Sequence, residues 1–295
     1  MDWLQLEIAP GVLDAERVAE ALAEAGALSV TFTDAADQPI FEPDPGQVTL
    51  WSATRVTGLF HADTDWEAVR IRLRTALQME ELPPHYFTPL AEREWVHEWL
   101  KDFTPMRFGR RLWICPTTYK PPDSGAINIL LNPGLAFGTG THPTTAMCLE
   151  WLDGEALAGR DVIDYGCGSG ILAIAAARLG AHHVWGVDHD PQALTATRDN
   201  ARANGVLADI DTCLPGQLPP LQVDALLANI LAKPLMELAP RFAGLLKPGG
   251  VLLLSGILDT QENQVRAAYT PWFRFTVATR RGEWLSLGAH LMEHT

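Results

Sequence analysis

Apolar and polar positions alternate along this chain in two distinct ways, and the second half has the more regular pattern. From about residue 160, short apolar runs alternate with longer segments that repeat an apolar residue every three or four positions. This order predicts strands of a mainly parallel sheet joined by helices in right-handed crossovers. The expected strands are residues 162–165, 183–188, 210–214, 223–228, 251–255, 273–279 and 283–289, the last two as a closing hairpin. The expected helices are residues 171–179, 191–204, 234–246 and 261–269, and KPGG at 247–250 is expected to be a turn. The pattern therefore predicts an α/β domain with a seven-stranded sheet.

The first 90 or so residues predict a separate and smaller module. Its strands are expected at residues 3–7, 29–33, 49–56 and 86–90, and its helices at 15–25 and 66–77. This βαββαβ order is typical of a ferredoxin-like α+β domain. The module has no glycine loop, cysteine cluster or nucleophile constellation, so we expect it to recognise a substrate and not to catalyse.

A tryptophan-bearing segment connects the two halves. Trp95 and Trp99 are spaced i, i+4, which places them on one face of a helix. A connecting helix packed onto the catalytic domain explains this spacing better than a contact with substrate. The predicted domains are residues 1–90 for substrate recognition, 91–105 for a linker helix and 106–295 for catalysis. The basic stretch MRFGRR, at the start of the third segment, is interpreted as a solvated turn.

The most informative motif is DYGCGSG, in which a buried strand enters a glycine-rich turn and then a helix. Gly166 and Gly168 let the backbone approach a ligand where a Cβ atom would clash. A dinucleotide fingerprint needs a glycine where this chain has Ile171, whereas Asp164 before the first glycine gives D-x-G-x-G-x-G. That arrangement resembles S-adenosylmethionine-dependent methyltransferases of the Rossmann-like class, which bind an amino-acid moiety here. Asp188 ends the next strand, where its carboxylate can accept hydrogen bonds from both hydroxyls of a ribose. The alternative is a glycine turn that only packs a helix on a strand.

Composition and charge narrow the class of partner. The chain has 295 residues and a net charge of −14, from 36 acidic against 22 basic residues. A protein that binds phosphates through charge neutralisation usually carries a basic face, so we expect no direct nucleic-acid binding and a basic protein as partner. The apolar runs are too short to cross a bilayer, and the acidic N-terminus is unlike a signal peptide. The four cysteines have no metal-ligand or CxxC spacing, so we expect reduced thiols in a cytoplasmic protein and no metal. We also expect a monomer.

Two further segments fall where a cofactor and a reacting amine would meet. In FGTGTHPTT, Phe137 could shield a methyl group from water, and a helix starting near Thr141 or His142 would present amide donors to a carboxylate. Taken alone, this segment also fits a glycine-rich connector with a hydroxyl cap. In NILAKP, Asn229 ends a strand at the carboxyl edge of the sheet, where α/β sites lie. Ordinary turn chemistry is the alternative there, and its position favours a role in holding an amine.

The chain resembles the PrmA family, the methyltransferases of ribosomal protein L11. The resemblance lies in FGTGTHPTT, DYGCGSG and ANIL in this order, together with the tryptophan linker and the small N-terminal module. The resemblance covers essentially the whole chain. It implies a class I, Rossmann-like methyltransferase domain and methyl transfer from S-adenosylmethionine to lysine side chains and the terminal α-amine of L11, giving trimethylated products. It also implies that the N-terminal module grips the substrate and reorients about the linker. The family's cofactor contacts correspond to Thr145, Gly166, Asp188 and Asn229, to which we add Gly168 and Phe137. Asn229 is the expected catalytic residue.

Chemistry limits the mechanism, and several rival functions stay open. A lysine with a pKa of about 10.4 must lose a proton before it attacks a sulfonium, and a dry site beside a positive charge favours its neutral form. No residue stands out as a general base, and for His142 a capping role is favoured. His189 replaces an apolar residue expected in the family. The rivals are a methyltransferase of the same fold acting on RNA or another protein, a nicotinamide dehydrogenase disfavoured by Ile171, and a non-catalytic cofactor sensor.

Overall fold

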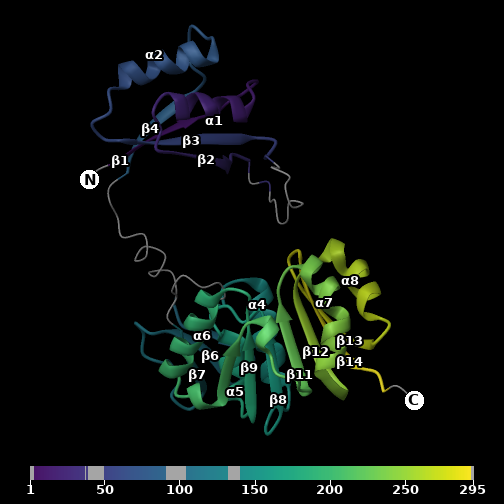
Figure 1. The fold of residues 1–295 in the computed structure, drawn as a ribbon. Coiled ribbons are helices and arrows are strands. Elements are labelled where there is room, and N and C mark those ends of the chain that lie inside the picture. Colours follow the sequence, from purple (N-terminus) through teal and green to yellow (C-terminus); the bar gives the residue numbers. More distant parts are fainter. Residues whose placement is uncertain (1–2, 37, 39–49, 91–103, 132–139, 294–295) are drawn as a thin grey trace. The chain divides into compact units, whose positions relative to one another are not determined.

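The computed structural model describes residues 3–36, 38, 50–90, 104–131 and 140–293, and Figure 1 shows its elements. The chain forms two compact units, Met1–Trp99 and Leu100–Thr295. Trp95 and Trp99 of the expected linker helix, and Phe137, lie outside the described residues. No helix among the described residues has both the length and the apolar composition needed to cross a membrane.

The N-terminal unit has the expected βαββαβ order. Its elements are β1 (Trp3–Ile8), α1 (Ala15–Glu24), β2 (Ser29–Asp34), β3 (Thr54–His61), α2 (Trp66–Leu77) and β4 (His85–Leu90). The strands form an antiparallel sheet in the order β2-β3-β1-β4, with both helices on one face (Figure 1). This is the ferredoxin-like arrangement, and no described helix covers the other face of the sheet, which we call the open face.

Alternating burial explains where the third of these strands lies. The expected strand at 49–56 was wrong in its limits, because β3 extends to His61. Val56 and Phe60 are buried against the helices, while Thr57 and Leu59 between them are only half-buried. The apolar face of this strand therefore lies further along the chain than the sequence pattern suggested.

The C-terminal unit contains the expected seven-stranded sheet among its described residues. The strands are β8 (Asp161–Tyr165), β9 (His183–Val187), β10 (Ile210–Cys213), β11 (Val223–Asn229), β12 (Leu246–Leu258), β13 (Phe273–Arg281) and β14 (Trp284–Leu291). They pair in the order β10-β9-β8-β11-β12-β14-β13, with β14 antiparallel to both of its neighbours. The helices are α4 (Pro143–Gly154), α5 (Ile171–Arg178), α6 (Pro191–Ala203), α7 (Ala232–Leu245) and α8 (Glu262–Tyr269). The prediction of a Rossmann-like α/β fold is confirmed.

Neighbouring strand residues face two separate cores. Val162 and Leu227 pack with α4, α5 and α6, whereas Ile163 and Leu226 pack with α7 and α8. Strands buried on both faces read as continuous apolar runs, and this is why the sequence marks them clearly. The two layers hold the carboxyl ends of the parallel strands at one edge.

Two local expectations were wrong. KPGG lies inside β12 and not in a turn before it, because β11 pairs with β12 on both sides of a bulge, Val223 with Leu246 and Ala225 with Val251. The stretch MRFGRR is more than a solvated turn. It forms β5 (Met106–Phe108) and the turn that leads into β6 (Leu112–Pro116). β6 pairs with β5 and with β7 (Ile127–Leu131) in a small sheet that the sequence did not predict.

A buried carboxylate ties this small sheet to the main domain. Asp153, near the end of α4, accepts hydrogen bonds from the backbone N–H groups of Arg110 and Arg111. Its carboxylate also forms an ion pair with the Arg111 guanidinium, in which Nε and Oδ1 are 3.0 Å apart. These donors hold the pKa of Asp153 below its ordinary value, although burial opposes them. The basic cluster therefore has a structural partner in α4, the helix that also carries Thr145.

Candidate cofactor-binding site

The carboxyl ends of three adjacent parallel strands bring the candidate residues together. Tyr165 at the end of β8 pairs with Val187 at the end of β9 and with Ala228 near the end of β11. The next residue along each strand is Gly166, Asp188 or Asn229. These three side chains or turns therefore meet at one sheet edge, as the sequence predicted.

The turn after β8 depends on glycine for its backbone conformation. Gly166, Gly168 and Gly170 have φ values of 84°, 52° and 80°, in the left-handed region that other residues rarely adopt. A Cβ atom on Gly166 would lie 2.2 Å from Cγ2 of Ile230. The first glycine is therefore required by packing within the protein, and not only by the approach of a ligand as the sequence argument held.

Asp188 is fixed by the backbone around it. Its Oδ2 accepts a hydrogen bond from the N–H of Gly168, and its Oδ1 accepts one from the N–H of Asp190, both at 3.0 Å. The imidazole of His189 lies 3.3 Å from Oδ1 but is 94% exposed, so it contributes little. An ionised carboxylate offers about four acceptor positions, and Asp188 therefore keeps capacity for two ribose hydroxyls.

Thr145 and Asn229 are joined directly, although they are far apart in the sequence. The side-chain amide Nδ2 of Asn229 donates to Oγ1 of Thr145 at 3.2 Å. Thr145 lies in the first turn of α4, whose N-cap is His142 with Pro143 at the first helical position. The sequence predicted both the helix start and the position of Asn229, but not this hydrogen bond.

His142 serves as the cap of that helix. Its Nδ1 accepts from the N–H of Thr144 and lies 2.7 Å from Oγ1 of the same residue. Its ring packs edge-on against Trp284 at 4.8 Å. Burial lowers the pKa of His142 from its ordinary value, which favours the neutral imidazole. The favoured structural role is therefore present in the fold.

Comparison with known proteins identifies the family of this chain. The model of the ribosomal protein L11 methyltransferase (PrmA) family matches residues 2–291. The chain belongs to this family.

Individual relatives agree with the family match. The chain is 54% identical over 288 residues to a ribosomal protein L11 methyltransferase of Pseudomonas aeruginosa, covering 97% of this chain and 98% of that one. It is 52% identical over 291 residues to one from Marinobacter nauticus, with the same coverage. The crystal structure of a ribosomal protein L11 methylase from Lactobacillus delbrueckii subsp. bulgaricus aligns with a TM-score of 0.60 and 33% identity, over 64% of this chain and all of that one.

Membership of this family confirms the resemblance found in the sequence, and with it a class I methyltransferase. The residues fit the expected cofactor, S-adenosylmethionine. Asp188 keeps acceptor positions that suit the hydroxyls of a ribose, and the glycine turn leads into the N-terminus of α5. Among the described residues, no group of three or more histidine, cysteine, aspartate or glutamate side chains is placed to hold a metal ion.

Asp164 has a role that the sequence did not reveal. The N-cap of α5 is Gly170, which has no side chain, and Oδ2 of Asp164 instead accepts from the N–H of Ala173 at 2.9 Å. Its Oδ1 is buried and has no hydrogen-bond partner among the described residues. Burial raises the pKa of Asp164 to about 7, and the negative charge of Asp188 adds to the shift. The sheet edge that carries the candidate site therefore contains two carboxylates, Asp188 and Asp164, and ionisation of Asp164 is unfavourable.

We predict that Asp188→Ala weakens S-adenosylmethionine binding by about 1.5–3 kcal/mol, because two ribose hydroxyls lose a charged acceptor. Isothermal titration calorimetry of the folded variant measures the change. Asp188→Asn is a useful companion, because it keeps one acceptor oxygen and removes the charge. Its affinity for S-adenosylmethionine should lie between that of the unmodified chain and that of Asp188→Ala. Unchanged affinity in a folded alanine variant would show that Asp188 does not contact the ribose.

We also predict a pH dependence of stability that originates at Asp164. Its folded-state pKa lies above its ordinary value of 3.8, so between about pH 4 and pH 7 the folded protein holds a proton that the unfolded chain has released. The free energy of unfolding of the ligand-free protein should therefore fall as pH rises through this window. One pKa unit corresponds to about 1.4 kcal/mol, so the fall amounts to a few kcal/mol.

Asp164→Asn isolates this contribution. The asparagine keeps an oxygen for the N–H of Ala173 and cannot ionise, so its stability should vary less between pH 4 and pH 7 than that of the unmodified chain. Urea unfolding at several pH values measures both proteins. Parallel pH profiles for the two would assign the dependence to other groups.

Proposed function

We propose that this methyltransferase transfers methyl groups from S-adenosylmethionine to lysine side chains and the terminal α-amine of ribosomal protein L11, giving trimethylated amines. The observation that carries the proposal is the family match over residues 2–291, together with the pairing of Thr145 and Asn229 at the edge of the sheet. A cytoplasmic, monomeric enzyme is part of the same proposal. Thr145, Gly166, Gly168, Asp188 and Asn229 form its cofactor site, with Phe137 as a further contact.

The hydrogen bond between Asn229 and Thr145 supports a catalytic role for Asn229. Because Nδ2 of Asn229 donates to Thr145, its Oδ1 lies on the other side of the amide and can accept from a substrate amine. An amine held in this way has its N–H directed at the amide and its lone pair free for an in-line attack. When bound, S-adenosylmethionine supplies an electrophilic methyl group on a sulfonium. The protein contributes mainly orientation.

The amine must arrive without its proton. Nδ1 of His142 already accepts a hydrogen bond from the N–H of Thr144, and burial lowers the pKa of the imidazole, so His142 is a weak base. A water-poor site next to a positive charge lowers the pKa of the acceptor amine and increases the neutral fraction. Proton loss to solvent before the amine enters the site is consistent with this arrangement.

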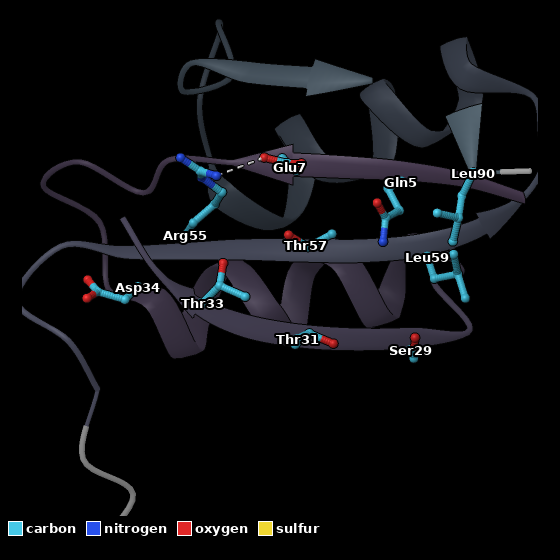
Figure 2. A pocket seen from close by; sticks show the side chains of 10 residues that line it. All are labelled: Gln5, Glu7, Ser29, Thr31, Thr33, Asp34, Arg55, Thr57, Leu59 and Leu90. Carbon is cyan, nitrogen blue, oxygen red and sulfur yellow. Dashed lines mark ion pairs between the residues drawn. The ribbon is translucent and has the colours of Figure 1, made fainter. Parts of the chain in front are cut away.

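We assign substrate recognition to residues 1–90, with 91–105 as a linker and 106–295 as the catalytic domain. The open face of the N-terminal sheet has a hollow of about 450 Å³, shown in Figure 2. Its lining residues are Gln5, Glu7, Ser29, Thr31, Thr33, Asp34, Arg55, Thr57, Leu59 and Leu90. This face is rich in hydroxyl groups, and Arg55, the one cation among the described lining residues, is paired with Glu7 at 3.3 Å. A surface of this kind favours hydrogen bonding to a basic protein over neutralisation of RNA phosphates.

A single assay distinguishes the proposed function from its rivals. The full chain is incubated with methyl-labelled S-adenosylmethionine and either purified L11, other ribosomal proteins, or ribosomal RNA. We expect label in L11, on lysines and the terminal amine, with mass spectrometry locating it. Label in RNA alone would support the RNA methyltransferase, and cofactor binding with no transfer to any acceptor would support a sensor.

Removal of the N-terminal unit separates recognition from catalysis. A fragment of residues 91–295 retains Thr145, Gly166, Asp188 and Asn229 and is of a size that commonly folds alone. It should bind S-adenosylmethionine and lose most of its L11 methylation. The N-terminal unit, by binding L11, raises the effective concentration of the acceptor amine at the catalytic domain, and the fragment lacks this unit. Circular dichroism checks folding before activity is measured. A folded fragment that methylates L11 at the rate of the full chain would remove recognition from the N-terminal unit.

A further inference from the structure

Helix α6 carries a row of buried polar side chains that the proposed chemistry does not use. Thr197, Asn200 and Asn204 recur at helical spacing and are 0%, 4% and 8% exposed. Asn204 caps the end of the helix and bonds Leu130 of β7. Burial of polar groups is costly unless each is hydrogen-bonded, so the partners of the row show what it stabilises.

The first two members of the row hold the glycine-rich turn. Oγ1 of Thr197 donates to the carbonyl oxygen of Gly168 at 3.1 Å, and it also lies 3.3 Å from Sγ of Cys167, the residue before that glycine. Nδ2 of Asn200 donates to the carbonyl oxygen of Ser169 at 2.9 Å. Two successive carbonyl groups of the turn are therefore directed at α6.

These contacts determine the orientation of the peptide units in the turn. A trans peptide bond places its carbonyl and the following N–H on opposite sides. Because the carbonyl of Gly168 points to Thr197, the N–H of Ser169 points away from α6. On the preceding peptide unit, the N–H of Gly168 donates to Asp188. The turn is thus held from two sides, by Asp188 on one and by α6 on the other.

Packing reinforces the hydrogen bonds at Thr197. A Cβ atom on Gly170 would lie 2.8 Å from Cγ2 of Thr197 and 3.0 Å from its Cα atom. The third glycine of the motif is therefore needed for close contact with α6, as well as for its own positive φ. The motif and this helix form one packed unit.

We propose that Thr197 and Asn200 are positioning residues of the cofactor site, which set the peptide orientations of the glycine-rich turn that receives the amino-acid end of S-adenosylmethionine. This inference rests on the proposed function, since it presumes that cofactor. Both residues act through the turn, by way of Gly168 and Ser169. Loss of their donors weakens cofactor binding more than it weakens the fold.

The test compares two substitutions that each remove one buried hydroxyl. Thr197→Val keeps the shape of the side chain and removes the donor to Gly168. Tyr269→Phe is the matched control, because the Tyr269 hydroxyl also donates to a buried backbone carbonyl, that of Leu235 at 2.8 Å, in the opposite core. Calorimetric titration gives Kd for S-adenosylmethionine, and urea unfolding gives stability.

Thr197→Val should raise Kd about tenfold. Its kcat at saturating cofactor should remain within about twofold of the original, because the chemistry at Asn229 is untouched. Tyr269→Phe should lose stability without a change in Kd, and Thr197→Ser, which restores the hydroxyl, should recover most of the affinity. If Thr197→Val does not fold, Asn200→Asp replaces it, since aspartate removes the donor to Ser169 at nearly constant volume and should also raise Kd.

Two results would overturn the inference while leaving the proposed function intact. One is cofactor affinity in Thr197→Val equal to that of the unmodified chain. The other is an equal loss of affinity in Tyr269→Phe, which would assign the effect to general stability. Failure of the unmodified chain to bind S-adenosylmethionine would instead overturn the proposed function, and this inference with it.

Discussion

Between β8 and α5 the chain must reverse direction within a few residues while leaving backbone groups available to a ligand. Positive φ at Gly166, Gly168 and Gly170 makes this reversal possible, and other residue types rarely adopt such angles. Because glycine can adopt many backbone conformations, the turn depends on its neighbours to hold it in a single one. Asp188 supplies that restraint from the adjacent strand, and α6 supplies it from the other side. The other candidate residues of the site, Asp188 and Asn229, lie at the strand ends on either side of this turn.

The charges at the sheet edge match one class of ligand. Asp188 is kept at the edge by backbone donors, and Asp164 is buried behind the turn with a raised pKa. A pyrophosphate brought to this turn would meet two acidic groups and be repelled by any that are ionised. A sulfonium cofactor with an amino group instead places positive charge near them. The same electrostatics that make Asp164 costly in the ligand-free protein therefore favour a cationic cofactor over a dinucleotide.

The sequence predicted those parts of the molecule in which buried apolar residues follow a regular pattern along the chain. The strands of the catalytic sheet are buried on both faces, and both the sheet and the meeting of Gly166, Asp188 and Asn229 could be predicted from that pattern. The small sheet of β5, β6 and β7 could not, because its strands are short and its tie to α4 is a long-range contact from Asp153. The bulge at KPGG was missed for a related reason. A proline and two glycines predict a turn locally, and only the pairing with β11 keeps the residues in a strand.

Polar residues of α6 show a limit of another kind. Thr197 and Asn200 look like solvated positions in a sequence, since neither residue type is usually buried. Their helical spacing on an otherwise alanine- and leucine-rich face was the available signal. That signal acquires a meaning only when the carbonyl groups of Gly168 and Ser169 are known to face the helix. The hydrogen bonds that fold the turn between β8 and α5 are therefore the same ones that we propose to orient it for the cofactor.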